Sequence, residues 1–149
     1  MDLENFASGF QALLIATPNI STLLTSFPGE DGNIPALFRN RAPQEAQAPF
    51  LVWHHVVTPI KYDSCGEVGT YETTVQIDLY AQDMEELDGI HKAVTDHVSF
   101  IDGAYADIDM GAVFISDNGP DENEAVDTDG ELTSPFRRID LRIHWTPTT

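Results

Sequence analysis

Length, composition and charge exclude several classes of protein. The chain has 149 residues, 25 of them acidic and 7 basic, and a formal net charge of −18. A chain of this length buries roughly 70% of its unfolded surface, so we expect one domain over 1–149 that folds without a metal or a disulfide. The charge disfavours tight binding to DNA or to anionic membranes, since both present phosphate groups.

Targeting and redox signals are sparse. The sequence opens with acidic residues rather than a cationic segment, which predicts no secretory signal. No apolar run reaches the ~18 residues that indicate a membrane-spanning helix. The single cysteine, Cys65, cannot form an internal disulfide, and we interpret it as an inert thiol.

The N-terminal segment is predicted to be an amphipathic helix over 3–15, since its apolar residues recur at helical spacing. Asp2 is placed to cap the start of this helix, and Pro18 to end it. Residues 19–27 are expected to add a short second turn of helix, with Asn19 as its N-cap. Residues 27–33, rich in Gly, Pro and Asp, are expected to form a loop.

The middle of the chain predicts strands. Residues 34–43 contain a short strand that Pro35 places at a sheet edge. Residues 49–60 form a β-rich run bounded by prolines, and 61–69 are expected to be a turn or a long hairpin tip. Residues 70–81 give the clearest strand, because apolar and polar side chains alternate along it.

Residues 83–101 are predicted to form a second long helix. Asp83 and Glu86 have the spacing of a capping box at its start. Its buried stripe comprises apolar residues at helical spacing: Leu87, Ile90, Val94, Val98 and Ile101. A short strand over 111–117 follows, and the last element is an alternating strand over 136–145. Together the elements predict an α+β fold: a mixed, mostly antiparallel sheet of about four to five strands with helices packed on one face.

Residues 117–134 are predicted to be an exposed acidic loop, because Gly and Pro accompany many carboxylates. The carboxylates are Asp117, Asp121, Glu122, Glu124, Asp127, Asp129 and Glu131. The fragment DTDG suggests a calcium-binding EF-hand. With Gly130 at the sixth position, however, Ala125 stands first and Phe136 twelfth, where that motif needs carboxylates. We therefore reject the motif and expect the loop to be dispensable for folding.

Positive charge is concentrated near the C-terminus, where Arg137, Arg138 and Arg142 are three of the seven basic residues. The polar side of the 70–81 strand carries Glu72 and Asp78. If the two strands are neighbours, the opposite charges face each other, and such pairs contribute about 0.2–1 kcal/mol each, which sets register more than stability. In an assembly, the same cationic face can instead meet an acidic face of a second copy.

No constellation of residues predicts catalysis, a metal site or a bound cofactor. His54 and His55 are adjacent on a strand and point to opposite faces. His91 and His97 are six apart on a helix, which is not the spacing of a zinc site. The sequence has no Gly-rich phosphate loop, nucleophile elbow or paired-cysteine motif. We therefore expect a protein that is not an enzyme.

Several strings together resemble the tail-terminator, or tail-completion, proteins of long-tailed bacteriophages. They are the opening helix LENFASGFQALLIA, the Pro-bounded strand APFLVWHHV, the strand-to-helix segment TTVQIDLYAQDMEELDGIHKAV and the late strand FRRIDLRIHW. The resemblance spans most of the chain as an order of elements. The acidic insertion at 117–131 departs from it.

The resemblance implies a structural protein of the virion, located at the tail neck after synthesis in the host cytoplasm. Such proteins form a hexameric ring that caps the tail tube, stops its polymerisation and contacts the head-side connector. The implied partners are further copies of the chain, the tail tube protein and a connector or head-closure protein. DNA passes through the lumen of the ring, where acidity would prevent it from binding.

Three other interpretations stay open. The first is another ring of the same region, a head-closure or tail-tube subunit, which uses a similar sheet. The second is an acidic module that shields a cationic partner, as a DNA mimic does. The third is an enzyme, which the sequence supports least because no spaced catalytic motif is present.

Overall fold

The computed structural model describes residues 3–16, 20, 23–24, 26–29, 32–43, 47–59, 62–64, 66–67, 69–98, 103–106, 108–118, 122–123 and 135–147. Its helices are α1 (Leu3–Ala16) and α3 (Met84–Val98). The longer strands are β4 (Phe50–Val57), β7 (Tyr71–Tyr80), β9 (Ile108–Asn118) and β11 (Pro135–Pro147). The shorter strands are β1 (Ser26–Gly29), β2 (Gly32–Pro35), β3 (Leu37–Arg39), β5 (Tyr62–Asp63), β6 (Gly66–Glu67), β8 (Gly103–Tyr105) and β10 (Glu122–Asn123). Neither of these two helices is long and apolar enough to cross a membrane.

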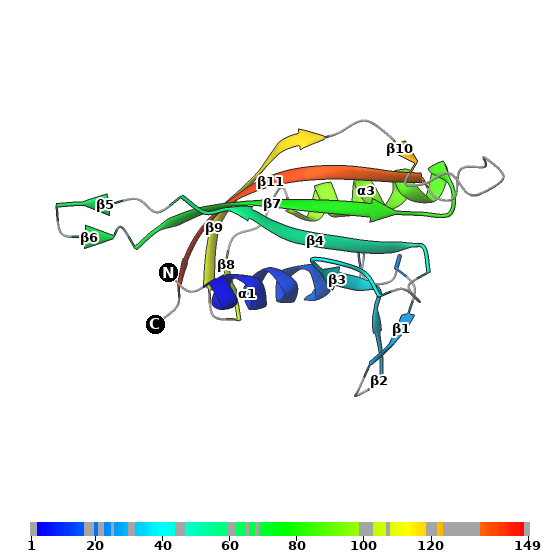
Figure 1. The fold of residues 1–149 in the computed structure, drawn as a ribbon, viewed down its shortest axis with the longest axis horizontal. Helices are drawn as coiled ribbons and strands as arrows, with labels where there is room; N and C mark the ends of the chain where they lie inside the picture. Colours follow the sequence, from blue (N-terminus) through cyan, green and yellow to red (C-terminus); the bar gives the residue numbers. More distant parts are fainter. Residues whose placement is uncertain are drawn as a thin grey trace.

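Seven strands form one curled sheet (Figure 1). Its order is β3-β4-β7-β11-β9-β8, with β10 paired beside β11. β3 runs parallel to β4, and the other pairings within the sheet are antiparallel. The sheet is mixed and mostly antiparallel as predicted, but it has seven strands rather than four to five. β8 and β10 make the difference, because strands of three and two residues are too short to show alternation.

Two small hairpins accompany this sheet. β5 and β6 form the expected hairpin tip, which projects beyond the ends of β4 and β7 (Figure 1). β1 and β2 correct the prediction for 26–33, because they pair as antiparallel strands where the end of a helical turn and a loop were expected. Ile20, within the helical turn predicted over 19–27, is helical. Pro28 and Gly29 indicated a loop, but strand propensity depends on context, and here each strand has a partner.

The core lies on one face of the sheet. Buried residues alternate along β7 and β11 and include Val75, Ile77, Leu79, Ile139, Leu141, Ile143 and Trp145. From α1, Phe10 packs edge-on against Trp53 of β4 with ring centroids 4.8 Å apart, and Phe6 lies 5.3 Å from Trp145. The buried side of α3 joins the same cluster. Both helices therefore pack on the same face of the sheet, as predicted.

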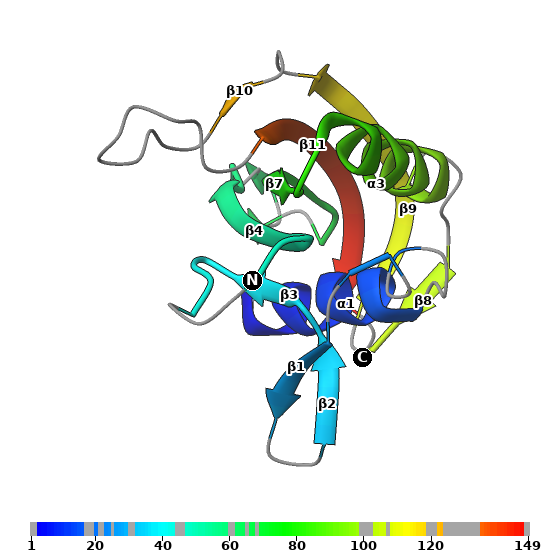
Figure 2. The same ribbon diagram turned by 90° about the vertical axis from the view of Figure 1, so that its right-hand side faces the viewer.

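α1 lies between the two edge strands of the curled sheet (Figure 2). Near β3, Gln11 Nε2 donates to Leu37 O at 3.5 Å. Near β8, α1 approaches so closely that a Cβ at Gly9 would stand 2.8 Å from Tyr105 O and 2.3 Å from Ile108 Cγ1. The helix can take this position only because residue 9 has no side chain.

α3 begins with the predicted cap. The Glu86 N–H donates to Asp83 Oδ1 at 2.8 Å, and Glu86 Oε1 accepts from the Gln82 N–H at 3.1 Å. The second bond thus reaches one residue earlier than in a standard capping box. The predicted stripe is buried at Leu87, Ile90, Val94 and Val98, and Ile101 lies outside the described residues.

The structure differs from the predicted acidic loop at two points. Asp117 lies in β9 opposite Asp140, and Glu122 lies in β10 opposite Phe136. Asp117 was also the last residue of the strand predicted over 111–117, and β9 is longer than that prediction, from Ile108 to Asn118. Register shifts interrupt its alternation, so the pattern shows only part of the strand. The other acidic residues of that segment lie outside the described residues: Asp121, Glu124, Asp127, Asp129 and Glu131. The predicted helix caps Asp2 and Asn19 and the predicted helix end Pro18 also lie outside them.

Candidate interaction face

The outer face is the side of β7 and β11 turned away from the helices. Its residues are Glu72, Thr74, Gln76, Asp78 and Tyr80 on β7, and Phe136, Arg138, Asp140, Arg142 and His144 on β11. β4 adds His54 and Val57, and β9 adds Phe114. Because β7 and β11 are direct neighbours, the acidic and basic side chains of the two strands share one surface.

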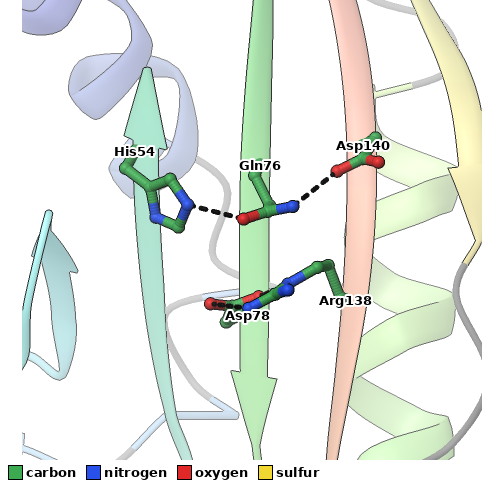
Figure 3. A network of polar contacts seen from close by, with 5 residues as sticks. All are labelled: His54, Gln76, Asp78, Arg138 and Asp140. Atoms are coloured by element: carbon green, nitrogen blue, oxygen red, sulfur yellow. Dashed lines mark hydrogen bonds and ion pairs between the residues drawn. The ribbon is translucent and has the colours of Figure 1, made fainter. Parts of the chain in front are cut away.

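Arg138 stands directly across from Asp78 (Figure 3). Its Nε donates to Asp78 Oδ1 at 2.8 Å and its Nη2 to Oδ2 at 3.3 Å, the two-point geometry of a strong Arg–carboxylate pair. The hydrogen bond to Asp78 raises the pKa of Arg138. The Arg138 side chain is 48% exposed and that of Asp78 only 8%. The guanidinium therefore lies at the surface above a buried carboxylate, and it brings positive charge to the outer face.

Arg142 makes a looser pair. Its Nη1 lies 3.7 Å from Glu72 Oε1, on the diagonal, because Thr74 is its direct neighbour. The other oxygen, Glu72 Oε2, lies 3.5 Å from His144 Nε2. The Arg142 side chain is 53% exposed, twice as much as that of Glu72 at 26%. Exposed pairs of this kind contribute only ~0–1 kcal/mol, so Arg142 can change partner at little cost.

A polar row crosses three strands beside these arginines (Figure 3). Gln76 of β7 donates its Nε2–H to Asp140 Oδ1 at 3.1 Å, and its Oε1 lies 2.6 Å from His54 Nε2. Because Gln76 Oε1 can only accept, the network assigns the hydrogen of His54 to Nε2. The row fixes β4, β7 and β11 side by side.

The third arginine of the last strand does not belong to the outer face. Arg137 is two residues before Ile139, so its side chain points to the same face of the sheet, toward the helices. There its Nη2 donates to Asp88 Oδ1 of α3 at 2.8 Å. Its side chain is largely buried. Sequence reasoning grouped it with Arg138 and Arg142 by proximity, although the alternation of the strand would have separated it from them.

A row of aromatic rings at one end of the outer face was missed by sequence reasoning. Phe50 and Tyr80 stack with ring centroids 4.6 Å apart, and Tyr80 and Phe136 stack at 5.4 Å. Phe38 of β3 meets Phe50 edge-on at 6.4 Å. The Arg138 guanidinium lies 5.8 Å from the centre of the Phe136 ring, so the row reaches the charged pair. The rings come from four strands, and their meeting depends on register rather than on a local pattern.

Apolar side chains flank Arg142 at the other end of the outer face. Phe114 stands opposite Arg142 on β9, and Val57 stands opposite Thr74 on β4. Both are about half-exposed, as is Val56 at the bulge where β4 leaves its regular pairing. Apolar groups exposed together on a sheet face turned away from the helices are typical of a surface that contacts another protein.

The histidines do not meet in the described part of the chain. His54 bonds Gln76 on the outer face, whereas His55 bonds Thr58 on the core side. His97 lies 3.4 Å from the backbone oxygen of Leu13. Across the residues that the structure describes, no three His, Cys, Asp or Glu side chains gather as ligands of a metal ion would.

No protein-family model matches the chain, and no curated protein matches it in sequence. Solved structures do resemble it. One is a chain of the virion of a native gene transfer agent particle, with a TM-score of 0.50 and 15% identity over 96% of this chain and 93% of that chain. Another, whose name states no role, has a TM-score of 0.55 and 10% identity over 100% of this chain and 97% of that one. At these identities the likeness shows a shared fold.

Proposed function

We propose that this chain is a structural protein of a phage-like virion and forms a hexameric ring at the end of the tail tube. The observation that carries the proposal is the likeness in fold, over nearly the full length of both chains, to a chain of a gene transfer agent virion. The strings that resemble tail-terminator proteins support a position at the tail neck. There the ring caps the tube, stops its polymerisation and joins it to the head-side connector.

The outer face offers contacts for such a ring. Arg138 and Arg142 lie above carboxylates that are more buried than they are, and Phe114 and Val57 are exposed beside them. Six copies with a charge of −18 each carry about −108 together, so neighbouring subunits need cationic groups where they meet. In the proposed ring, the two guanidinium groups meet acidic side chains of the next copy. The apolar groups add buried area to the contact.

The remaining acidity suits a lumen through which DNA passes. A wall of like charge does not bind phosphate groups, because binding needs cations that displace counterions. The proposed partners are further copies of the chain, the tail tube protein and a head-side connector or head-closure protein. The proposed role is structural and involves no catalysis, cofactor or membrane.

Native mass spectrometry and electron microscopy of the purified protein, alone and with tail tubes, test the ring. A six-fold ring that binds one end of a tube supports the proposal. Long self-assembled tubes would instead identify a tube subunit, which the shared fold also accommodates. A protein that stays monomeric and binds no tube end contradicts the proposal, as does tight binding to duplex DNA at physiological ionic strength.

Charge reversal tests the proposed contact separately. The double variant Arg138→Glu with Arg142→Glu should not form rings in analytical ultracentrifugation. Arg41→Glu, at an exposed arginine that follows β3, is the matched control and should form rings as the wild type does. Rings of undiminished stability in the double variant would show that the outer face is not the subunit contact.

A further inference from the structure

A chain of hydrogen bonds runs from the core to a titratable ring near the β5–β6 hairpin. Trp145 Nε1 donates to Thr73 Oγ1 at 2.7 Å. Thr73 Oγ1 lies 2.8 Å from Thr58 Oγ1, which lies 2.7 Å from His55 Nε2. Thr73 and Trp145 are buried. The chain thus connects β11 and β7 to the residues at the end of β4.

One order of hydrogens gives every donor of this chain an acceptor. The indole of Trp145 can only donate, so Thr73 Oγ1 accepts from it. The Thr73 hydroxyl then donates to Thr58, and the Thr58 hydroxyl donates to His55 Nε2. This order needs a lone pair on Nε2, and therefore a neutral His55 with its hydrogen on Nδ1.

Protonation of His55 would exclude that order. Nε2–H would then donate to Thr58, so the Thr58 hydroxyl could no longer donate to the ring. Either Thr58 would donate to Thr73, or the Thr58 oxygen would accept from both Thr73 and His55. In both cases one hydroxyl hydrogen of the chain would lose its acceptor among the described residues. The loss of that hydrogen bond favours the neutral ring.

The surroundings of His55 act in the same sense. Desolvation lowers the pKa of His55, and the positive charge of Arg39 on β3 lowers it further. From β7, Val75 stands opposite His55, and Thr73 completes the chain. Trp145 faces the site from β11. Of these neighbours only Arg39 carries a charge, and its Nη1 lies 3.5 Å from Glu4 Oε1 of α1, which offsets part of that charge. Desolvation, the larger cause of the lowered pKa, favours the neutral ring.

We infer that His55 acts as a proton-sensitive latch that holds the base of the β5–β6 hairpin closed at neutral pH and loosens it in mild acid. Thr58 precedes the hairpin in the chain and Thr73 follows it. Their contact therefore joins the two segments from which the hairpin projects. β4 and β7 stay paired from Phe50 through Val57, so the opening is local. The inference does not depend on ring formation.

Native-state hydrogen exchange tests the latch in the purified chain. The readout is the protection of the backbone amides of Val57, Thr58 and Thr73, corrected for intrinsic exchange. Between about pH 7.5 and about pH 5.5, we expect protection in the wild type to fall about tenfold, the scale of one buried hydrogen bond.

Three variants separate the latch from a general effect of acid. His55→Gln offers an acceptor to Thr58 without titrating, so protection should stay high at both pH values. Thr73→Val removes the middle of the chain, and protection should be low at both. His97→Gln is the control, because burial also lowers the pKa of His97 on α3. It should keep the response of the wild type.

Two results would overturn the latch. One is a His55→Gln variant whose hairpin responds to pH as the wild type does. The other is a nuclear magnetic resonance titration in which His55 of the wild type is already protonated at neutral pH. The titration needs no variant, so it decides the question even if a substitution prevents folding.

Discussion

β7 and β11 turn one face toward the helices and the other outward, and neighbouring residues of the same strands build both. The inner face is apolar, with Ile77, Leu79 and Leu141 fully buried. The outer face carries ion pairs such as Arg138–Asp78. A buried aliphatic side chain contributes ~1.5–3 kcal/mol and an exposed ion pair ~0–1 kcal/mol. The inner face therefore holds the fold, and the outer face is free to serve register and contact with other proteins.

The different contributions of the two faces to stability are tested most directly by truncating two adjacent residues of β11 whose side chains point to opposite faces. Leu141→Ala should lower the free energy of unfolding by about 2–5 kcal/mol, because it leaves a cavity in the core. Arg142→Ala should change it by less than about 0.5 kcal/mol, because it removes only an exposed pair. Urea unfolding followed by circular dichroism measures both. Equal losses in the two variants would contradict the division between the faces.

A second comparison tests how tightly the helices pack on the inner face. Gly9→Ala should destabilise the protein by about 1–3 kcal/mol, since the new Cβ meets Ile108 and the backbone oxygen of Tyr105. Gly89→Ala on α3 is the matched control. A Cβ there meets nothing within 4 Å, so better helix propensity should stabilise the protein by about 0.4–1 kcal/mol. Thermal unfolding gives both values, and a neutral Gly9→Ala would mean that α1 packs less closely.

On the outer face itself, the largest effect should come from the pair with the buried carboxylate. Arg138→Met leaves the carboxylate of Asp78 without its two hydrogen bonds, which we expect to cost about 1 kcal/mol after allowance for the exposed guanidinium. The double variant with Asp78→Asn should recover most of that loss, and a double-mutant cycle measures the coupling. A coupling energy near zero would mean that the pair does not set register.

The smallest effect is a dependence of stability on pH. Burial lowers the pKa values of His55 and His97 below 6.5. Between 6.5 and the lowered values the unfolded state binds more protons, so the free energy of unfolding rises with pH. This stability is fully present above pH 6.5 and is lost as the pH falls below it. The double variant His55→Gln with His97→Gln should flatten urea-unfolding stability across that range. A slope unchanged from the wild type would rule these two groups out as its source.

Much of the fold follows from local patterns. The helices α1 and α3, the strands β7 and β11, and the buried stripe from Leu87 to Val98 were predicted because alternation and helical spacing are visible over ten or more residues. β4 was predicted because a β-rich run lies between two prolines. β8, β10 and the β1–β2 hairpin were missed, because short strands exist only through their partners. The sequence identified the segment that carries the three arginines, but it did not predict that Arg137 points inward and bonds to Asp88.

The sequence by itself determined the composition of each face, the excess of negative charge and the places where helices begin. These depend on neighbouring residues, whose side chains alternate or repeat with a fixed period. Only the tertiary structure decided which strands adjoin. That choice brought Arg138 to Asp78, stacked Phe50, Tyr80 and Phe136, and led the hydrogen bonds from Trp145 to His55. Such contacts join residues far apart in the chain, and a shift of one residue in register would abolish them, because it turns every side chain of a strand to the other face.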